Sequence, residues 1–140
     1  MNYDEDCIFC KIGRKEIASA KVYEDSEVLA FLDVNPVTKG HTLVITKEHF
    51  SNFNEVPKNL INKVFQVAQT VSQAAIMELH ATGVNILTNV NPSAGQSVMH
   101  FHVHVIPRYD NTDGFKLDFT PKAIGTRDMT NIATMIKKGL

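Results

Sequence analysis

Residues 100–104 read His-Phe-His-Val-His, so half of the chain's six histidines alternate with apolar residues in one short segment. In a β-strand, side chains at positions i, i+2 and i+4 share one face. The alternation therefore predicts a strand over residues 99–106. Its three imidazoles would form a row on one face, and the intervening apolar side chains would point to a core.

The length and charge of the chain limit its architecture and its partners. With 140 residues we expect one domain, with a core over residues 7–108 and a C-terminal extension over 109–140. The net charge is −1 and no Lys/Arg stripe is present, which argues against a nucleic-acid partner. No apolar run approaches the length of a membrane span, and the acidic residues 1–6 do not resemble a signal peptide. We therefore expect a cytoplasmic protein that does not bind membranes.

The rest of the chain reads as short strands around one long helix. β-Rich segments at residues 22–24, 28–33, 41–46 and 84–89 join the histidine strand. Apolar residues at helical spacing predict a helix that begins at Pro57 and is stopped by Gly83. Shorter helical segments are expected at residues 7–14 and 128–138, and a turn or short helix at 47–54. Successive hairpins with one long helix indicate an α+β fold with an antiparallel sheet of about five strands.

The histidine strand alone allows three interpretations. It could be a half-buried strand with a histidine-rich polar face, although such faces usually mix Thr, Lys and Glu. It could be a three-histidine metal site, but the three residues spread over roughly 13 Å of strand, so the strand would have to bend. It could also place one nucleophilic imidazole between two that orient it or shuttle protons.

The turn before this strand favours phosphate chemistry. Gly95 allows backbone N–H groups to face an anion, and Ser97 adds a hydroxyl. A row of imidazoles beside such a turn suits phosphoryl transfer.

Residues 95–104 also resemble the signature of the histidine triad (HIT) superfamily, most closely the Hint branch of nucleoside phosphoramidases and related bacterial HIT proteins. The resemblance extends to residues 33–36, 39–45 and Asn89, and covers the chain from residue 7 to about 108. It implies the HIT fold. It also implies a homodimer with the long helix and a strand edge at the interface.

The resemblance implies a different task for each histidine. His102 would attack the α-phosphorus of a nucleotide and form a covalent nucleotidyl-imidazole, which water then releases as a nucleoside monophosphate. His104 would contact the phosphate, the backbone carbonyl of His100 would orient His102, and His41 would support the triad.

The resemblance also assigns the nucleotide contacts. Asp33 would bind the ribose hydroxyls. The phosphate or the leaving group would be bound by Asn89, Gln96 and Ser97. An apolar purine slot would be lined by Ile8, Phe9, Ile12, Phe31, Leu32 and Val34.

Cys7 and Cys10, the only cysteines, are too close in sequence for a disulfide between them to cross-link distant parts of the fold. Their Cys-x-x-Cys spacing indicates metal or redox chemistry, and a zinc site would need two more ligands. Related HIT enzymes complete such a pair with two histidines, which correspond here to His49 and His100. The resemblance thus implies a structural Zn²⁺ site.

We therefore expect a hydrolase or transferase that acts on purine nucleotides, most closely a nucleoside phosphoramidase. One alternative is a dinucleoside polyphosphate hydrolase. Another is a nucleotide-binding regulatory or scaffold module with vestigial activity.

Overall fold

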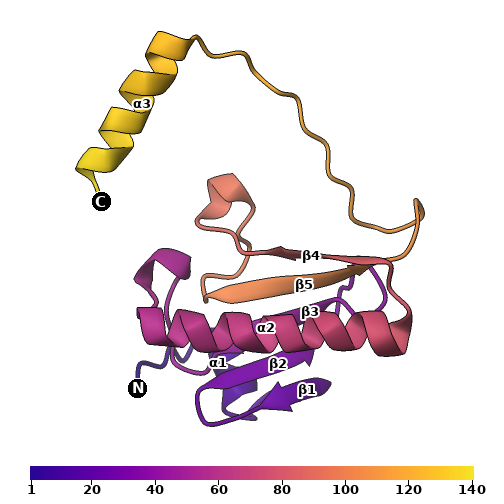
Figure 1. Ribbon diagram of the computed structural model, residues 1–140. Coiled ribbons are helices and arrows are strands. Elements are labelled where there is room, and N and C mark those ends of the chain that lie inside the picture. Colours follow the sequence, from indigo (N-terminus) through magenta and orange to yellow (C-terminus); the bar gives the residue numbers. More distant parts are fainter.

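A single antiparallel sheet organises the chain, and the computed structural model describes all residues from 1 to 140. The strand order across the sheet is β1-β2-β3-β5-β4. The strands are β1 (Lys21–Glu24), β2 (Val28–Leu32), β3 (Thr42–Thr46), β4 (Gly83–Leu87) and β5 (His102–Arg108). The predicted α+β fold with five antiparallel strands is confirmed (Figure 1).

Three helices join the sheet, and two 3₁₀ turns lie at Phe53–Glu55 and Pro92–Ala94. α1 (Ile8–Gly13), α2 (Lys58–Leu79) and α3 (Thr126–Lys138) correspond to the three predicted helical segments. The long helix α2 ends at His80, which adopts the left-handed conformation with φ 60°. The prediction that Gly83 stops this helix is wrong, because Gly83 is already the first residue of β4.

The two faces of the sheet bury different clusters. On one face α2 packs against the strands, as Figure 1 shows, and the core there includes Val44, Val64, Ala68, Phe101 and Val103. On the other face α1 covers a second cluster, whose members include Phe9, Cys10, Leu29, Phe31 and Ile45. The strands alternate between these clusters residue by residue. The histidines of β5 therefore lie on the face of α1, opposite α2.

The histidine segment departs from the prediction at its start. β5 begins at His102 rather than at residue 99, and His100 lies before the strand. β5 pairs with β3 only as far as His102 opposite Ile45, close to the end of β3 at Thr46. The N–H of Phe101 donates instead to the carbonyl of Phe50, at 2.7 Å. The three imidazoles therefore do not form one straight row.

The chain beyond β5 separates into a loop and an arm. Gly114 still donates its N–H to the carbonyl of Val37, at 2.8 Å. After Phe115 the chain leaves the body, and α3 stands apart from the sheet (Figure 1). None of the helices is long and apolar enough to cross a membrane.

Gly40 lies in the loop before β3, where its backbone comes close to the end of α2. We expect Gly40→Ala to destabilise the fold. Its φ is +88°, and an added Cβ would lie 2.5 Å from Cδ1 of Leu79. The left-handed conformation alone should lower the free energy of unfolding by about 1–2 kcal/mol, measured by urea denaturation. Gly83→Ala is the matched control, because a Cβ there meets nothing within 4 Å and its φ is not positive. Equal stability losses in the two variants would contradict this account.

Candidate active site

His102 is buried at the start of β5 with one nitrogen held and the other left free. Its Nδ1 lies 2.7 Å from the backbone carbonyl of His100. A carbonyl only accepts hydrogen bonds, so Nδ1 carries the proton of the neutral ring, and Nε2 keeps its lone pair. Burial lowers the pKa of His102, which favours this neutral form. The ring is therefore arranged as a nucleophile.

Apolar side chains from α1 and β2 pack around this imidazole. The ring of Phe9 meets His102 edge to face at 5.1 Å between centroids, and Phe9 also meets the ring of Phe31 edge to face at 5.6 Å. Ile12 belongs to the same buried cluster. These three of the six expected purine-slot residues lie together on the histidine face of the sheet.

The other three members of the expected slot are placed differently. Ile8 and Val34 are exposed, with Val34 at 86%. Leu32 follows Phe31 in β2, so strand alternation turns its side chain to the face of α2. Leu32 is therefore not brought to the histidines, because neighbouring strand residues cannot share a face.

His41 and His104 form a hydrogen-bond relay that begins at the backbone. The N–H of Val37 donates to Nδ1 of His41 at 3.2 Å, and Nε2 of His41 lies 2.9 Å from Nδ1 of His104. Because Nδ1 of His41 accepts, the proton of the neutral ring is on Nε2 and is donated to His104. His104 then carries its own proton on Nε2. That N–H is a donor suited to a phosphate oxygen.

Burial keeps this pair neutral. The pKa of His104 is lowered to about 4 by desolvation, and the nearby rings of His102 and His41 act in the same direction. Desolvation also lowers the pKa of His41, although the carboxylate of Asp33 opposes this shift.

Asp33 lies at the end of β2, beside the relay. One carboxylate oxygen accepts the N–H of Asn35 at 2.9 Å, as in a turn, and the other lies 3.7 Å from Nε2 of His41. The structure thus places Asp33 with the histidine pair, and it also gives the side chain a local structural role.

In the turn before β5, the side chain of Gln96 is buried, whereas that of Ser97 is exposed. Gln96 is buried: its Nε2 donates to the carbonyls of Ser51 and Val98, and its Oε1 accepts the N–H of Asn91. These contacts use both donors, so Gln96 holds the turn in place, and its side chain has no N–H left for the phosphate or leaving group that the family resemblance implies for it. Ser97 is exposed, and Asn89 makes one long contact of 3.5 Å to the carbonyl of Gly95.

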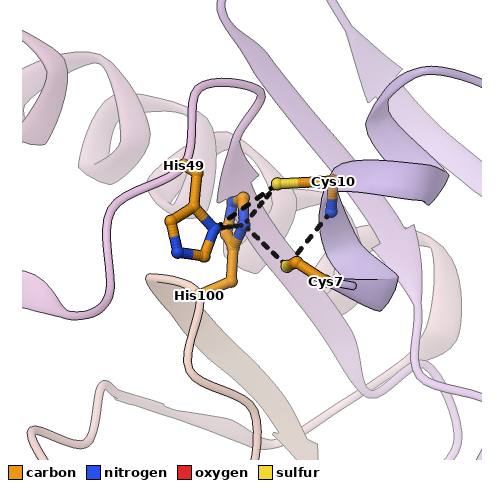
Figure 2. Close-up of side chains that lie close together, drawn as sticks. All are labelled: Cys7, Cys10, His49 and His100. Atoms are coloured by element: carbon orange, nitrogen blue, oxygen red, sulfur yellow. Dashed lines mark hydrogen bonds between the residues drawn. The ribbon is translucent and has the colours of Figure 1, made fainter. Parts of the chain in front are cut away.

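Behind the triad, Cys7, Cys10, His49 and His100 converge, as Figure 2 shows, with their donor atoms all within 4.8 Å of one another. Nδ1 of His100 lies 3.3 Å from Sγ of Cys7 and 3.5 Å from Sγ of Cys10. Nδ1 of His49 lies 3.4 Å from Sγ of Cys10 and 3.2 Å from Nδ1 of His100. These separations are close to the edges of a tetrahedron with Zn–S of about 2.3 Å and Zn–N of about 2.0–2.1 Å.

The protonation of His100 suits such a site. Its Nε2 lies 2.7 Å from the carbonyl of Thr46, so the proton is on Nε2, and the lone pair of Nδ1 faces the two sulfurs. Burial lowers the pKa of His100 to about 4 and raises the pKa of the Cys10 thiol to about 11. Both shifts favour the uncharged forms of His100 and Cys10.

Asp33, His41 and His104 also lie within metal-binding distance of one another, but their protons are arranged differently. A metal on Nε2 of His41 would displace the proton from that nitrogen. The proton could not move to Nδ1, which faces the N–H of Val37. This second cluster is therefore a hydrogen-bond relay rather than a metal centre.

Comparison with known proteins identifies the family. A family model described as HIT domain matches residues 14–111. The chain belongs to the HIT family. It is 45% identical over 147 aligned residues to Protein hit of Bacillus subtilis (strain 168). This alignment covers 100% of this chain and 98% of that protein.

Two HIT relatives carry names of enzymes. Adenosine 5'-monophosphoramidase HNT1 of Saccharomyces cerevisiae is 35% identical, covering 79% of this chain and 68% of that protein. Adenylylsulfatase HINT3 of Arabidopsis thaliana is 38% identical, covering 74% of this chain and 52% of that protein. Hydrolysis of nucleotide compounds is thus represented within the family.

Solved structures of HIT proteins match nearly the whole chain. A HIT family protein from Bacillus anthracis is 40% identical with a TM-score of 0.93, covering 97% of this chain and 98% of that chain. A member of the HIT family from Bacillus subtilis is 46% identical with the same TM-score and coverage. The expected HIT fold is confirmed.

Backbone groups of this HIT domain also hold the site's histidine rings in place, and the sequence did not predict these contacts. The carbonyl of Thr46 and the N–H of Val37 set the protons of His100 and His41. Every residue type offers the same backbone groups, so no residue pattern marks these positions. Gly114 is a partial exception, because a Cβ there would lie 2.6 Å from the carbonyl oxygen of Val37.

Burial of His104 should make the stability of the fold depend on pH. Unfolded His104 takes up a proton near pH 6.5 and folded His104 only near pH 4, so between these values the unfolded state binds more protons. The free energy of unfolding should fall as the pH falls from 7 to 5, and His104 should account for ~1–2 kcal/mol of that loss. His104→Asn should remove this share in urea denaturation at the two pH values. The exposed His80 gives the matched control, His80→Asn, and an identical pH dependence in all three proteins would refute the assignment.

Proposed function

We propose that this HIT protein hydrolyses purine nucleotides at the α-phosphate through a covalent nucleotidyl-histidine, as a purine nucleoside phosphoramidase. The observation that carries the proposal is the arrangement of His102. Its Nδ1 is bound to the carbonyl of His100, and its Nε2 is free on the face that also presents His104. An unprotonated imidazole nitrogen is an effective nucleophile at neutral pH.

The first step breaks the phosphorus–nitrogen bond of the substrate. Nε2 of His102 attacks the α-phosphorus, the phosphorus–nitrogen bond breaks, and the amine departs with the hydroxyl proton of Ser97. Nε2–H of His104 donates to a phosphate oxygen on which negative charge increases in the transition state. The relay from Val37 through His41 keeps that donor in place.

The second step regenerates the enzyme. Water attacks the same phosphorus, the bond from phosphorus to Nε2 of His102 breaks, and the nucleoside monophosphate leaves. The proton lost by the water returns to Ser97. The protein's own groups thus account for every proton in the two steps.

Substrate contacts follow from the placement of the remaining residues. Asp33 would accept hydrogen bonds from the ribose hydroxyls, and Asn89 would bind the phosphate. The purine would pack against the apolar surface formed by Phe9, Ile12 and Phe31, with Ile8 and Val34 at its exposed margin. The names of the HNT1 and HINT3 relatives, which refer to adenosine monophosphate and adenylyl compounds, support a purine substrate.

The adduct on His102 provides the direct test. Incubation with adenosine 5′-phosphoramidate followed by an acid-free quench should show a nucleotidyl adduct by intact mass. His102→Ala should lose the adduct and lower kcat by about 10⁴-fold or more, as expected for removal of a nucleophile. The exposed-histidine control, His80→Ala, should keep both.

Other outcomes of this experiment separate the alternatives. Faster turnover of diadenosine polyphosphates than of the phosphoramidate would favour a dinucleoside polyphosphate hydrolase. Nucleotide binding with neither adduct nor turnover would favour a regulatory or scaffold module.

We also propose that Cys7, Cys10, His49 and His100 hold a structural Zn²⁺. The two sulfurs and two nitrogens fit the preferred donors and the tetrahedral spacing, and four protein ligands leave no open position for catalysis. The ion would tie α1 to the segment before β5. Cysteine thiols available for zinc suit a reducing compartment, so we propose the cytoplasm.

Zinc removal should separate stability from chemistry. Elemental analysis should find about one zinc per chain, and Cys7→Ser should lose the metal and lower Tm, because binding free energy at such a site contributes to folding. His102→Ala should keep the zinc while losing turnover. A wild type that is free of metal and keeps its full stability would refute the zinc site.

Finally, we propose a homodimer that uses α2 and the outer edge of β4. Phe65 and Ile76 on α2 and Ile86 on β4 are exposed by 36–48%, and we call this surface the dimer face. A shallow groove of about 600 Å³ runs along it between Ile61, Phe65 and Ile86. β4 is also an edge strand, with unpaired backbone groups on its outer side.

A further inference from the structure

Residues 109–115, which we call the closing loop, follow β5 directly and are closed by one ion pair. Arg108, the last residue of β5, donates from Nε to Oδ2 of Asp113 at 2.9 Å. The same carboxylate oxygen accepts the backbone N–H of Tyr109 at 3.1 Å. The side chain of Asp113 is only 7% exposed, so the ion pair is largely shielded from solvent.

The other nitrogens of Arg108 fix the closing loop to the sheet. Nη1 donates to Oδ1 of Asn85 in β4 at 2.7 Å, and Nη2 donates to the carbonyl of Phe115 at 2.8 Å. A guanidinium presents its donors in a rigid planar fork, so these acceptors are held at set positions relative to one another. The far end of the closing loop is therefore placed by the sheet itself.

The closing loop contacts the segment that leads to His41. The N–H of Gly114 donates to the carbonyl of Val37 at 2.8 Å. The hydroxyl of Tyr109 donates to the carbonyl of Lys39 at 2.6 Å. The chain between β2 and β3 forms neither strand nor helix, so these two bonds hold its backbone from outside.

The neutral pair of His41 and His104 has two self-consistent proton arrangements. In the first, Nε2–H of His41 donates to Nδ1 of His104, whose own proton is then on Nε2. In the second, both protons move to the opposite nitrogens, so Nδ1 of His104 donates to His41 and Nε2 of His104 carries a lone pair.

The backbone of Val37 favours the first arrangement. Its N–H lies 3.2 Å from Nδ1 of His41, and in the second arrangement two N–H donors would face each other there. The carboxylate of Asp33 acts in the same direction, but at 3.7 Å from Nε2 of His41 it is too far for a hydrogen bond. The position of the Val37 N–H therefore decides the tautomers of both rings.

We propose that Arg108 and Asp113 are positioning residues for the reaction. Through Gly114 they hold Val37 where its N–H keeps the proton of His104 on Nε2. Only this arrangement gives His104 a donor for the phosphate oxygen, because in the other a lone pair would meet negative charge. The inference rests on the proposed function.

Proton–nitrogen NMR spectra of the histidine rings test this directly, because the two tautomers have different ring nitrogen frequencies. Near neutral pH and without substrate, wild-type His41 and His104 should be in their Nε2–H forms. Asp113→Ala should give a mixture of both tautomers in each ring, because the closing loop is no longer held. His102 should stay in its Nδ1–H form, since the carbonyl of His100 fixes it.

Two further variants separate positioning from stability. Asp110→Ala is the matched control, because this carboxylate lies in the same loop but accepts only from Thr112, and its tautomers should match wild type. Gly114→Ala should mix the tautomers as Asp113→Ala does, since its Cβ would lie 2.6 Å from the carbonyl oxygen of Val37. Unchanged tautomers in Asp113→Ala or Gly114→Ala would overturn the proposal, whatever the change in stability. Equal mixing in Asp110→Ala would also overturn it.

Steady-state kinetics on adenosine 5′-phosphoramidate give a second measurement. A donor to charge that develops in the transition state affects kcat, so Asp113→Ala should lower kcat about 10–100-fold and keep KM within a few-fold of wild type. A raised KM with unchanged kcat would overturn the positioning role. Absence of turnover in the wild type would count against the proposed reaction alone, because the tautomers are measured without substrate.

Discussion

The contacts of His100 hold the site together. Its carbonyl accepts from His102, its Nε2 donates to the carbonyl of Thr46, and its Nδ1 faces two sulfurs. One residue thus contributes to the orientation of the nucleophile, to the end of β3 and to the cysteine cluster. It can do so because β5 begins two residues later, which leaves its backbone and ring out of the sheet.

Burial favours uncharged side chains in the clusters on both sides of His102, but the nitrogens of their histidines have different partners. In the cysteine cluster, desolvation favours the neutral imidazole of His100, whose Nδ1 lone pair faces the two sulfurs, and the neutral thiol of Cys10. Around His41 and His104, desolvation also keeps the rings neutral, but here each nitrogen is paired donor to acceptor. Backbone groups thus set the protons of the histidines differently in the two clusters: the carbonyl of Thr46 fixes the proton of His100 on Nε2, and the N–H of Val37 keeps Nδ1 of His41 an acceptor.

The sequence predicted most of the fold because its apolar periodicity is strong. The five strands and the three helical segments were placed within a few residues, and the alternation at residues 102–106 was interpreted correctly. The start of β5 was missed because the length of β3, not the histidine pattern, decides where pairing begins. Gln96 shows a second limit. The sequence of a glycine-containing turn does not tell whether a side-chain amide in it faces a ligand or, as here, donates to the carbonyl of Ser51. The cysteine pair was marked by its own spacing, and His100 and His104 by the alternating histidines. The remaining members, His49, His41 and Asp33, came from the family resemblance, and the proton arrangement needed coordinates.

The loop from Asp33 to His41 shows what kind of change this site can tolerate. The peptide N–H of Val37 reaches His41, and the carbonyl of the same residue accepts from Gly114. Neither contact uses the side chain of Val37, so many residues other than proline would preserve both at this position. An insertion or deletion of one residue would instead shift the peptide out of reach. The chemistry therefore constrains the length of this loop more strongly than its composition.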